Sequence, residues 1–463
     1  MKKITLLAIC SFVLVITSNA NNVVVSTVSL GPKITAGPVS THYTQVNYDI
    51  TWQNSWRTST NESNYDGCWI FVKYRKQSTS VWQHATINST SQTVPSGSVI
   101  QTSADGKGVW MYRNADGIGT VNWTAAGLRW NYGADGVLDN ENVEVRVYAV
   151  EMVYVPQSPF NLGNSSTESY KFRDGLVDTW FPVTSENAIS CGTNAGDLFA
   201  AYNFDASGSI PASYPKGYNA FWSMKYEFSK QQVVDFLNTL DQTNANARNS
   251  VGATGLVPNM LVTEPERAAD LVSVKNFLAW LDWAAMRPMT ELEYEKACRG
   301  GNNLPSPLEY AWGNTTISPI TTATNQGAAD ETWATGNANY NIGPGVPMRC
   351  GALATASSNR TSSGATFYGI MEMSGNYAEL VAFAGSTASR TFDGLHGDGI
   401  LSASAEANTA NWESTSNNLT MTAKGGAFIS SYTSLQVSER TNGAFDYASP
   451  YSMLNGRAVR TGE

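Results

Sequence analysis

The spacing of apolar residues changes near residue 150, and this change limits the fold more than any other feature of the 463-residue chain. Before it, apolar and polar residues alternate, as in residues 46–52. After it, apolar residues recur at helical spacing, as in Val233, Phe236, Leu237 and Leu240. Alternation is typical of a half-buried β-strand, whereas recurrence every three or four residues is typical of an amphipathic helix. The chain is therefore predicted to contain an all-β part followed by an α+β part.

The first part, residues 21–150, is predicted to form a β-sandwich. Residues 69–74, 109–112 and 143–148 are further predicted strands, and Asp-Gly turns at 116–117 and 135–136 separate them. Several short strands with regular turns are typical of a sandwich. Six tryptophans are predicted to give this part a core of its own: Trp52, Trp69, Trp82, Trp110, Trp123 and Trp130.

The second part, residues 151–463, is predicted to begin with capped helices and to continue as loops. Capping boxes, which pair a Ser or Thr with a Glu or Gln three residues later, start at Ser229, Thr263 and Thr290. After Gly301 the sequence is rich in Gly, Asn, Ser and Thr. No linker sequence separates the two parts, so we predict two separately packed domains that are held close together.

The N-terminus is predicted to be an export signal. Lys2 and Lys3 precede the apolar run 4–16, and Ser18-Asn19-Ala20 fits a cleavage site. Residues 1–20 are therefore the predicted signal peptide, and no later segment reaches the roughly 18 to 20 apolar residues of a membrane helix. We predict a protein that acts outside the cell, on its surface or in the periplasm. Four cysteines remain after cleavage, and their pairing stays open: Cys68, Cys191, Cys298 and Cys350.

Charge and histidine content exclude two classes of function. Lys and Arg number 29 and Asp and Glu number 38, which gives a net charge of −9. An acidic chain with scattered basic residues is a poor partner for nucleic acid or an anionic membrane. The three histidines, His42, His84 and His396, lie far apart in the sequence, so no His-rich metal centre is expected.

Residues 287–301 (RPMTELEYEKACRGG) resemble a signature of the formylglycine-generating enzyme family, whose domain is also named after sulfatase-modifying factor. The resemblance covers about residues 152–460 and implies a loop-rich variant of the C-type-lectin-like fold. Six further motifs resemble the family's in the same order, at residues 151–163, 226–238, 311–314, 368–379, 424–428 and 456–460.

The resemblance does not extend to the catalytic residues. Active oxidases of this family bind copper through two cysteines that follow the Gly-Gly strand. Aligned on Gly425 and Gly426, those positions hold Ser430 and Leu435. A hydroxyl and an isobutyl group cannot replace two thiolates as soft ligands of Cu(I). An iron-dependent branch of the family needs several His ligands, and the matching region contains only His396.

Calcium is the cofactor that the resemblance implies. The central motif would supply the carboxylates of Glu372 and Glu379 and the backbone carbonyls of Gly375 and Tyr377. Calcium prefers six to eight hard oxygen ligands, which such a loop provides. A second family site would begin with Asn325 and the Gln326 carbonyl, but its later Asp is not matched near Tyr340 and Asn341.

These observations predict an exported, non-catalytic binding or structural protein. Low charge and abundant Trp, Tyr, Asn and Gly suit contacts with carbohydrate or protein at the cell exterior. A more specific hypothesis is a self-assembling surface-layer or appendage subunit, whose Val-rich N-terminal strand docks into a neighbour by β-augmentation. The alternative is an oxidoreductase of the same family that acts on a peptide or thiol through an unrecognised site.

Overall fold

The computed structural model describes residues 23–79, 81–269, 273–341, 343–355, 357–412, 421–443, 445 and 453–462. The predicted signal peptide, residues 1–20, lies outside these ranges. Within them, no helix combines the length and the apolar character that crossing a bilayer requires.

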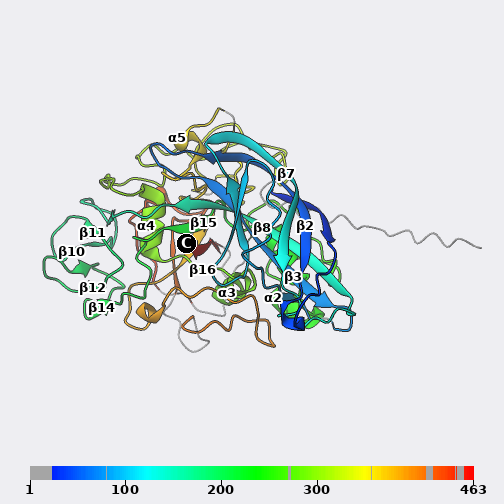
Figure 1. Cartoon of the computed structure of the whole chain (residues 1–463). Helices are drawn as coiled ribbons and strands as arrows, with labels where there is room; N and C mark the ends of the chain where they lie inside the picture. The colour runs from blue at the N-terminus through cyan, green and yellow to red at the C-terminus, as the bar shows by residue number, and fades with distance from the viewer. Residues whose placement is uncertain are drawn as a thin grey trace, which may run out of the picture.

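Strands dominate the structure, which is mostly β, and two sheets face each other in its N-terminal part (Figure 1). The smaller sheet has the strand order β1-β2-β7, from β1 (Val24–Leu30), β2 (Thr44–Arg57) and β7 (Gly117–Trp130). The larger sheet has eight strands in the order β16-β22-β15-β8-β3-β6-β5, with β4 paired to β3. Its strands are β3 (Asp66–Lys76), β4 (Gln83–His84), β5 (Ser98–Thr102), β6 (Val109–Arg113), β8 (Val143–Val155), β15 (Phe221–Met224), β16 (Arg287–Pro288) and β22 (Ala458–Thr461).

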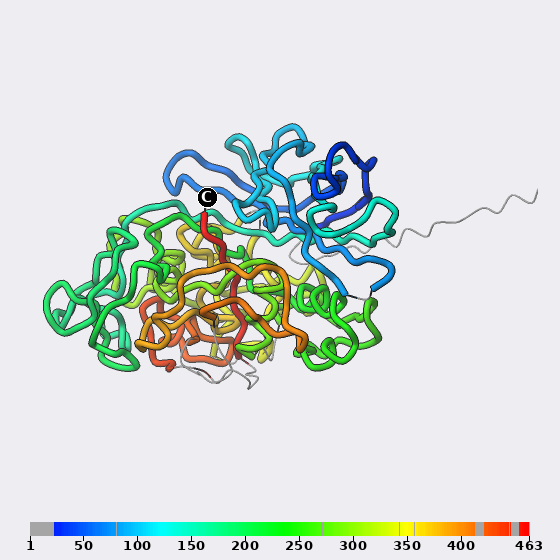
Figure 2. The backbone as a smooth tube through the Cα atoms, turned by 60° about the horizontal axis from the view of Figure 1, so that its bottom comes forward, coloured from blue at the N-terminus to red at the C-terminus, as the bar shows by residue number. Residues whose placement is uncertain are grey.

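The larger sheet is buried on both faces, as β3 shows most clearly. Its residues Cys68, Ile70 and Val72 pack into a cluster with the strands of the smaller sheet. The alternate residues Trp69 and Phe71 pack into a second cluster that includes the helices of the C-terminal part. A strand buried on both faces has an almost continuous apolar sequence, as residues 68–72 do. Figure 2 shows the resulting layers, with the N-terminal strands on one side of the molecule and the C-terminal part on the other.

Strand β8 belongs to both parts of the chain. Its residues from Val143 to Val153 pair with β3, and its residues from Met152 to Val155 pair with β15. The predicted domain boundary at residue 150 therefore falls inside one strand. The division into residues 21–150 and 151–463 stays a prediction. The predicted tryptophan core is confirmed in part: Trp52, Trp123 and Trp130 lie in a cluster formed within residues 23–147, whereas Trp69 and Trp110 pack in a cluster that extends into the C-terminal part. Trp110 stacks on Trp222 of the C-terminal part at a ring-centroid distance of 4.5 Å.

A buried ion triad ties the two parts together at this sheet. The Nζ of Lys225 lies 3.1 Å from the Asp66 carboxylate and 3.1 Å from that of Glu151. Asp66 also accepts hydrogen bonds from the indole of Trp52 and the hydroxyl of Ser55. All three charged side chains are almost fully buried, and burial raises the pKa of Glu151 to about 8.

The helices are short, and two of the three predicted capping boxes are confirmed. Ser229 caps α1 together with Gln232, and Thr290 caps α4 together with Glu293. The third prediction is wrong, because Glu264 takes a positive φ of 56° and its carboxylate pairs with Arg267. The next helix begins only after Ser273. The helices are α1 (Lys230–Leu237), α2 (Gln242–Arg248), α3 (Val274–Trp283), α4 (Glu291–Arg299) and α5 (Arg360–Ser363).

Small strand pairs and loops make up the rest of the C-terminal part. A lobe at the left of Figure 1 contains β9 (Phe160–Leu162), β10 (Arg173–Asp174), β11 (Phe181–Val183), β12 (Ile189–Ser190), β13 (Leu198–Phe199) and β14 (Ser209–Ile210). The remaining strands are β17 (Ala323–Thr324), β18 (Thr332–Trp333), β19 (Ala378–Ala382), β20 (Met421–Lys424) and β21 (Leu454–Gly456). β19 lies between β20 and β21 in a three-stranded sheet.

Two expectations about the N-terminal strand and the cysteines can be compared with the structure. β1 pairs with β2 of the same chain, and Val23 and Val25 are buried there. One edge of β1 is therefore paired within the chain, and both the docking of this strand into a neighbour and self-assembly stay predictions. All four cysteines whose pairing the sequence left open are buried free thiols.

We expect a protein truncated after Val150 to lack a cooperative thermal transition. The truncation cuts β8 and exposes Trp69, Phe71 and Trp110, and each large apolar side chain stabilises the fold by roughly 1.5–3 kcal/mol when buried. Circular dichroism of residues 21–150 during heating measures this. A sharp transition at the temperature of the full chain would contradict the shared core.

We expect Lys225→Met to lower the free energy of unfolding by about 3–5 kcal/mol, because it leaves the buried Asp66 carboxylate without its counter-ion. The matched control is Lys76→Met, which removes a partly exposed ion pair with Glu141 and should cost at most about 1 kcal/mol. Urea unfolding of both variants gives the two values, and equal losses would argue against a special role for the triad.

Candidate functional site

The two positions that hold copper-binding cysteines in active members of the family are occupied here by Ser430 and Leu435. These two side chains do not form a pair of metal ligands. Ser430 is half-buried, and its hydroxyl accepts a hydrogen bond from the amide of Ala427 at 2.9 Å. Leu435 is fully buried in a cluster with Tyr294 and Met373. Its side chain also packs so closely on Gly426 that a Cβ added there would lie 2.7 Å from a Leu435 methyl carbon. Hydrocarbon therefore fills the second position.

The residues predicted to bind calcium lie in a buried cluster of three carboxylates and one guanidinium. Arg457 Nε donates to Glu379 Oε1 at 2.8 Å. Glu372 Oε1 accepts from the amide of Gly351 at 2.9 Å. Glu227, which the sequence analysis did not assign to the site, accepts from the amide of Tyr377 at 2.8 Å. β19, the loop before it and the segment between β21 and β22 bring these groups together.

Burial dominates the electrostatics of this cluster. It raises the pKa of Glu372 to about 7. Burial, followed by the negative charge of Glu379, raises the pKa of Glu227 well above its usual range. Burial also raises the pKa of Glu379, against the lowering effect of Arg457. Burial therefore disfavours the charged form of all three carboxyl groups, and the guanidinium of Arg457 opposes this effect.

The arrangement fits Arg457 better than it fits a calcium ion. A cation beside Glu379 would stand next to the guanidinium, which already takes one oxygen of that carboxylate. Within the described residues, no group of three His, Cys, Asp or Glu side chains is placed to hold a metal ion. One buried oxygen each of Glu372 and Glu379 has no hydrogen-bond partner among the described residues. Calcium binding here stays a prediction that the donor set does not favour.

The second predicted calcium site is an exposed turn. Asn325 and Gln326 are both exposed. The Asn325 amide donates to Asp330 at 2.7 Å, and the amide of Gly327 donates to Glu331 at 2.7 Å. The side chains near Asn325 thus satisfy one another. His396 is also engaged, since its Nε2 accepts from the amide of Thr461 at 3.0 Å.

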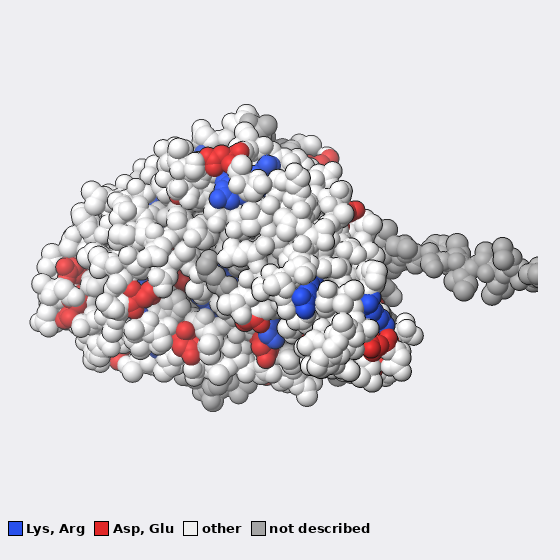
Figure 3. All heavy atoms as spheres, in the orientation of Figure 1, with Lys and Arg blue, Asp and Glu red and all other residues white. Residues whose placement is uncertain are grey.

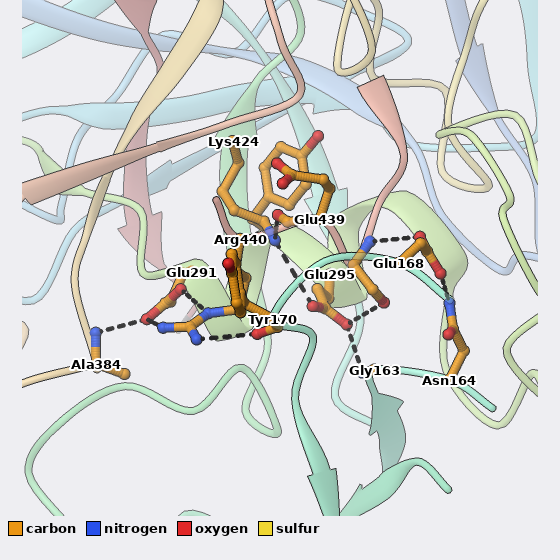
Figure 4. A network of polar contacts seen from close by, with 12 residues as sticks. Gly163, Asn164, Glu168, Tyr170, Glu291, Glu295, Ala384, Lys424, Glu439 and Arg440 are labelled. Atoms are coloured by element: carbon orange, nitrogen blue, oxygen red, sulfur yellow. Dashed lines mark hydrogen bonds and ion pairs between the residues drawn. The ribbon is translucent and has the colours of Figure 1, made fainter. Parts of the chain in front are cut away.

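The charged residues of the signature helix α4 also have structural partners (Figure 4). Arg440 forms a paired contact with Glu291, at 2.8 Å from its Nε. Glu295 accepts from the amide of Gly163 at 2.7 Å and lies 3.8 Å from the Nζ of Lys424. Because all these groups are buried, the network joins α4 to β20 and the loop after β9. It presents no charge to a ligand.

A groove of about 800 Å³ lies apart from these residues, and the sequence analysis did not predict it. Its walls come from β1, the first half of β8, one face of α1 and the loop before residue 262. The carboxylate cluster, by contrast, borders a void of only about 10 Å³, which is too small for an organic ligand. The groove could not be predicted because four segments far apart in the sequence form it. Its polar face on α1 comes from Gln231, Asp235 and Asn238.

The outer surface in Figure 3 carries few charged atoms, and positive and negative groups are mixed on the face that is drawn. No basic patch is visible on that face.

Comparisons with known proteins point to one family. The model of the sulfatase-modifying factor enzyme 1-like domain matches residues 146–452. No curated protein matches the chain. The solved structure of Treponema denticola variable protein 1 is 12% identical, with a TM-score of 0.33, over 68% of this chain and 96% of that one. A structure titled "Crystal Structure of CarF" is 12% identical, with a TM-score of 0.28, over 66% of this chain and 99% of that one. Both TM-scores are too low to carry an argument.

We expect chelation of calcium to leave the melting temperature unchanged, because Arg457 already neutralises Glu379. Glu379→Gln should instead lower the melting temperature equally with and without chelator, since it leaves the buried guanidinium without a counter-ion. Differential scanning calorimetry in calcium and in chelator measures both effects. A melting temperature that falls in chelator and is restored by calcium would establish the ion at this site.

Proposed function

The chain belongs to the family of sulfatase-modifying factor enzyme 1-like domains, and we propose that it is an exported, non-catalytic binding or structural protein. The observation that carries this proposal is the replacement of the two copper-binding thiols. Ser430 offers one hydroxyl, and Leu435 is part of the hydrophobic core. The family's oxidation chemistry has no ligand pair at its expected place, while the buried contacts that build the domain are kept.

The proposal includes a finer description of the fold and of the location. We propose that residues 151–463 form a C-type-lectin-like domain and that the two N-terminal sheets act as a sandwich in front of it. Export would follow from the signal peptide predicted at residues 1–20. Exposed Tyr170, Tyr202 and Tyr432 offer aromatic surfaces that suit carbohydrate or protein partners. Calcium remains a candidate ligand to be tested as described above.

The alternative is an oxidoreductase with an unrecognised site. The burial and the raised pKa values of the cysteines give it little support. Reactive cysteines need a lowered pKa and access to solvent. Here burial raises the pKa of Cys68 and Cys350 well above the usual value and raises that of Cys298 to about 12. Copper or iron bound at one ion per chain in the purified protein would nevertheless favour the enzyme.

We expect the protein to leave a cysteine-containing sulfatase peptide unchanged in the presence of copper and oxygen. Mass spectrometry detects the conversion of Cys to formylglycine, and an active member of the family serves as the positive control. The variant Ser430→Ala should behave like the wild type, because no step depends on that hydroxyl. Conversion of the peptide by the wild type would overturn the proposal.

A further inference from the structure

We propose that the groove between β1, β8 and α1 binds an extended polypeptide segment, which adds a strand to the open edge of β8. This inference deepens the proposed binding function and rests on it. The groove lies where the two N-terminal sheets meet the C-terminal part, and its lining combines an unpaired strand edge with exposed apolar side chains.

The edge of β8 is the first part of the argument. One edge of β8 pairs with β3 from residue 143 to residue 153, but β15 covers the other edge only from residue 152 to residue 155. Among the described residues, no backbone hydrogen bond links the stretch 143–150 to a segment other than β3. In an antiparallel ladder, alternate residues direct their N–H and C=O groups to opposite sides. Every second residue of this stretch therefore offers an unpaired donor and acceptor.

β1 forms the wall of the groove opposite β8. Its edge is less suited than the edge of β8 to hydrogen bonding with a bound strand. It is an edge strand of the smaller sheet, but its register shifts between Ser26 and Ser29. Thr27 takes a positive φ of 56° at this irregularity. A bulge interrupts the ladder and turns the edge away from regular pairing. A bound strand would therefore hydrogen-bond to β8 and pack its side chains against β1.

The side chains of the groove match such a strand. Val28 of β1 is 37% exposed and Leu261 in the opposite loop is 70% exposed. Val145 projects from β8 into the same groove. When a partner covers the apolar side chains of a groove, their surface is removed from water, and this stabilises the complex. The stretch of β8 that lines the groove, residues 144–148, spans about 16 Å at roughly 3.3 Å per residue, so the groove covers about five residues of a bound strand.

The open backbone edge narrows the chemistry of the occupant. The charged side chains of the lining already have partners within the chain. Glu144 pairs with Arg75 and with Arg146, and Asp235 accepts a hydrogen bond from Gln231. A lipid or a small apolar molecule would cover the side chains but would leave the backbone groups of β8 unpaired, and those groups therefore favour a polypeptide.

The test uses a fluorescent nonapeptide of alternating valine and threonine with one lysine, and the full-length protein. Two matched peptides carry N-methyl groups, one on the odd residues and one on the even residues. Only one of these sets of N–H groups faces β8 in a bound strand. We expect the parent peptide to bind in fluorescence anisotropy, one methylated peptide to bind at least tenfold more weakly, and the other to bind like the parent.

Two single variants locate the binding in the groove. Leu261→Asp should weaken binding of the parent peptide at least tenfold, because Leu261 lines the groove. Leu256→Asp is the matched control, since Leu256 is also 70% exposed but does not line the groove, and it should bind like the wild type. Both variants should keep the melting temperature of the wild type.

Three results would overturn the inference: no binding of the parent peptide, equal binding of both methylated peptides, or equal losses in the two variants. Equal binding of the methylated peptides would indicate apolar adsorption without strand pairing. These results are independent of the sulfatase-peptide assay. Formylglycine formation would overturn the proposed non-catalytic function and leave the groove result standing, whereas a failure to bind the nonapeptide would remove only the groove.

Discussion

The burial of the eight-stranded sheet on both faces is the constraint on which the rest of the structure depends. A sheet with two apolar faces needs a layer on each side. The smaller sheet supplies one layer through β2 and β7, and the helices of the C-terminal part supply the other. Trp69 and Trp110 pack against the C-terminal layer, so the two parts share this face of the sheet, whereas the cluster between the two sheets is formed within residues 23–147. The triad of Asp66, Glu151 and Lys225 lies in this shared sheet and fixes its register with buried charges.

The contacts that hold the signature helix in place are physically separate from the positions of Ser430 and Leu435. The signature helix α4 is held by buried ion pairs, such as Arg440 with Glu291 and Arg287 with Glu293. None of these contacts uses the two positions now occupied by Ser430 and Leu435. Replacing a thiol by a leucine side chain at a buried position adds apolar packing, so the core does not oppose the change. Fold and catalytic site are thus physically separable in this chain.

The arrangement of the sheets leaves a groove beside β8. β15 is much shorter than β8, so the first half of β8 has no neighbour on one side. The smaller sheet stands over this half and closes a groove with α1. The groove is therefore a consequence of joining a long strand of the N-terminal layer to a short strand of the C-terminal part.

The sequence alone determined the features that depend on neighbouring residues. Alternation predicted β2 and a dense apolar run predicted β3. The capping boxes at Ser229 and Thr290 predicted the starts of α1 and α4. These signals act within a few residues. Only the tertiary structure decided that β8 crosses the predicted boundary, that Arg457 pairs with Glu379 and that β1, β8 and α1 form one groove. These features depend on contacts between residues tens to hundreds of positions apart. Local spacing carries no signal for such contacts, because they arise only when the sheet is buried on both faces.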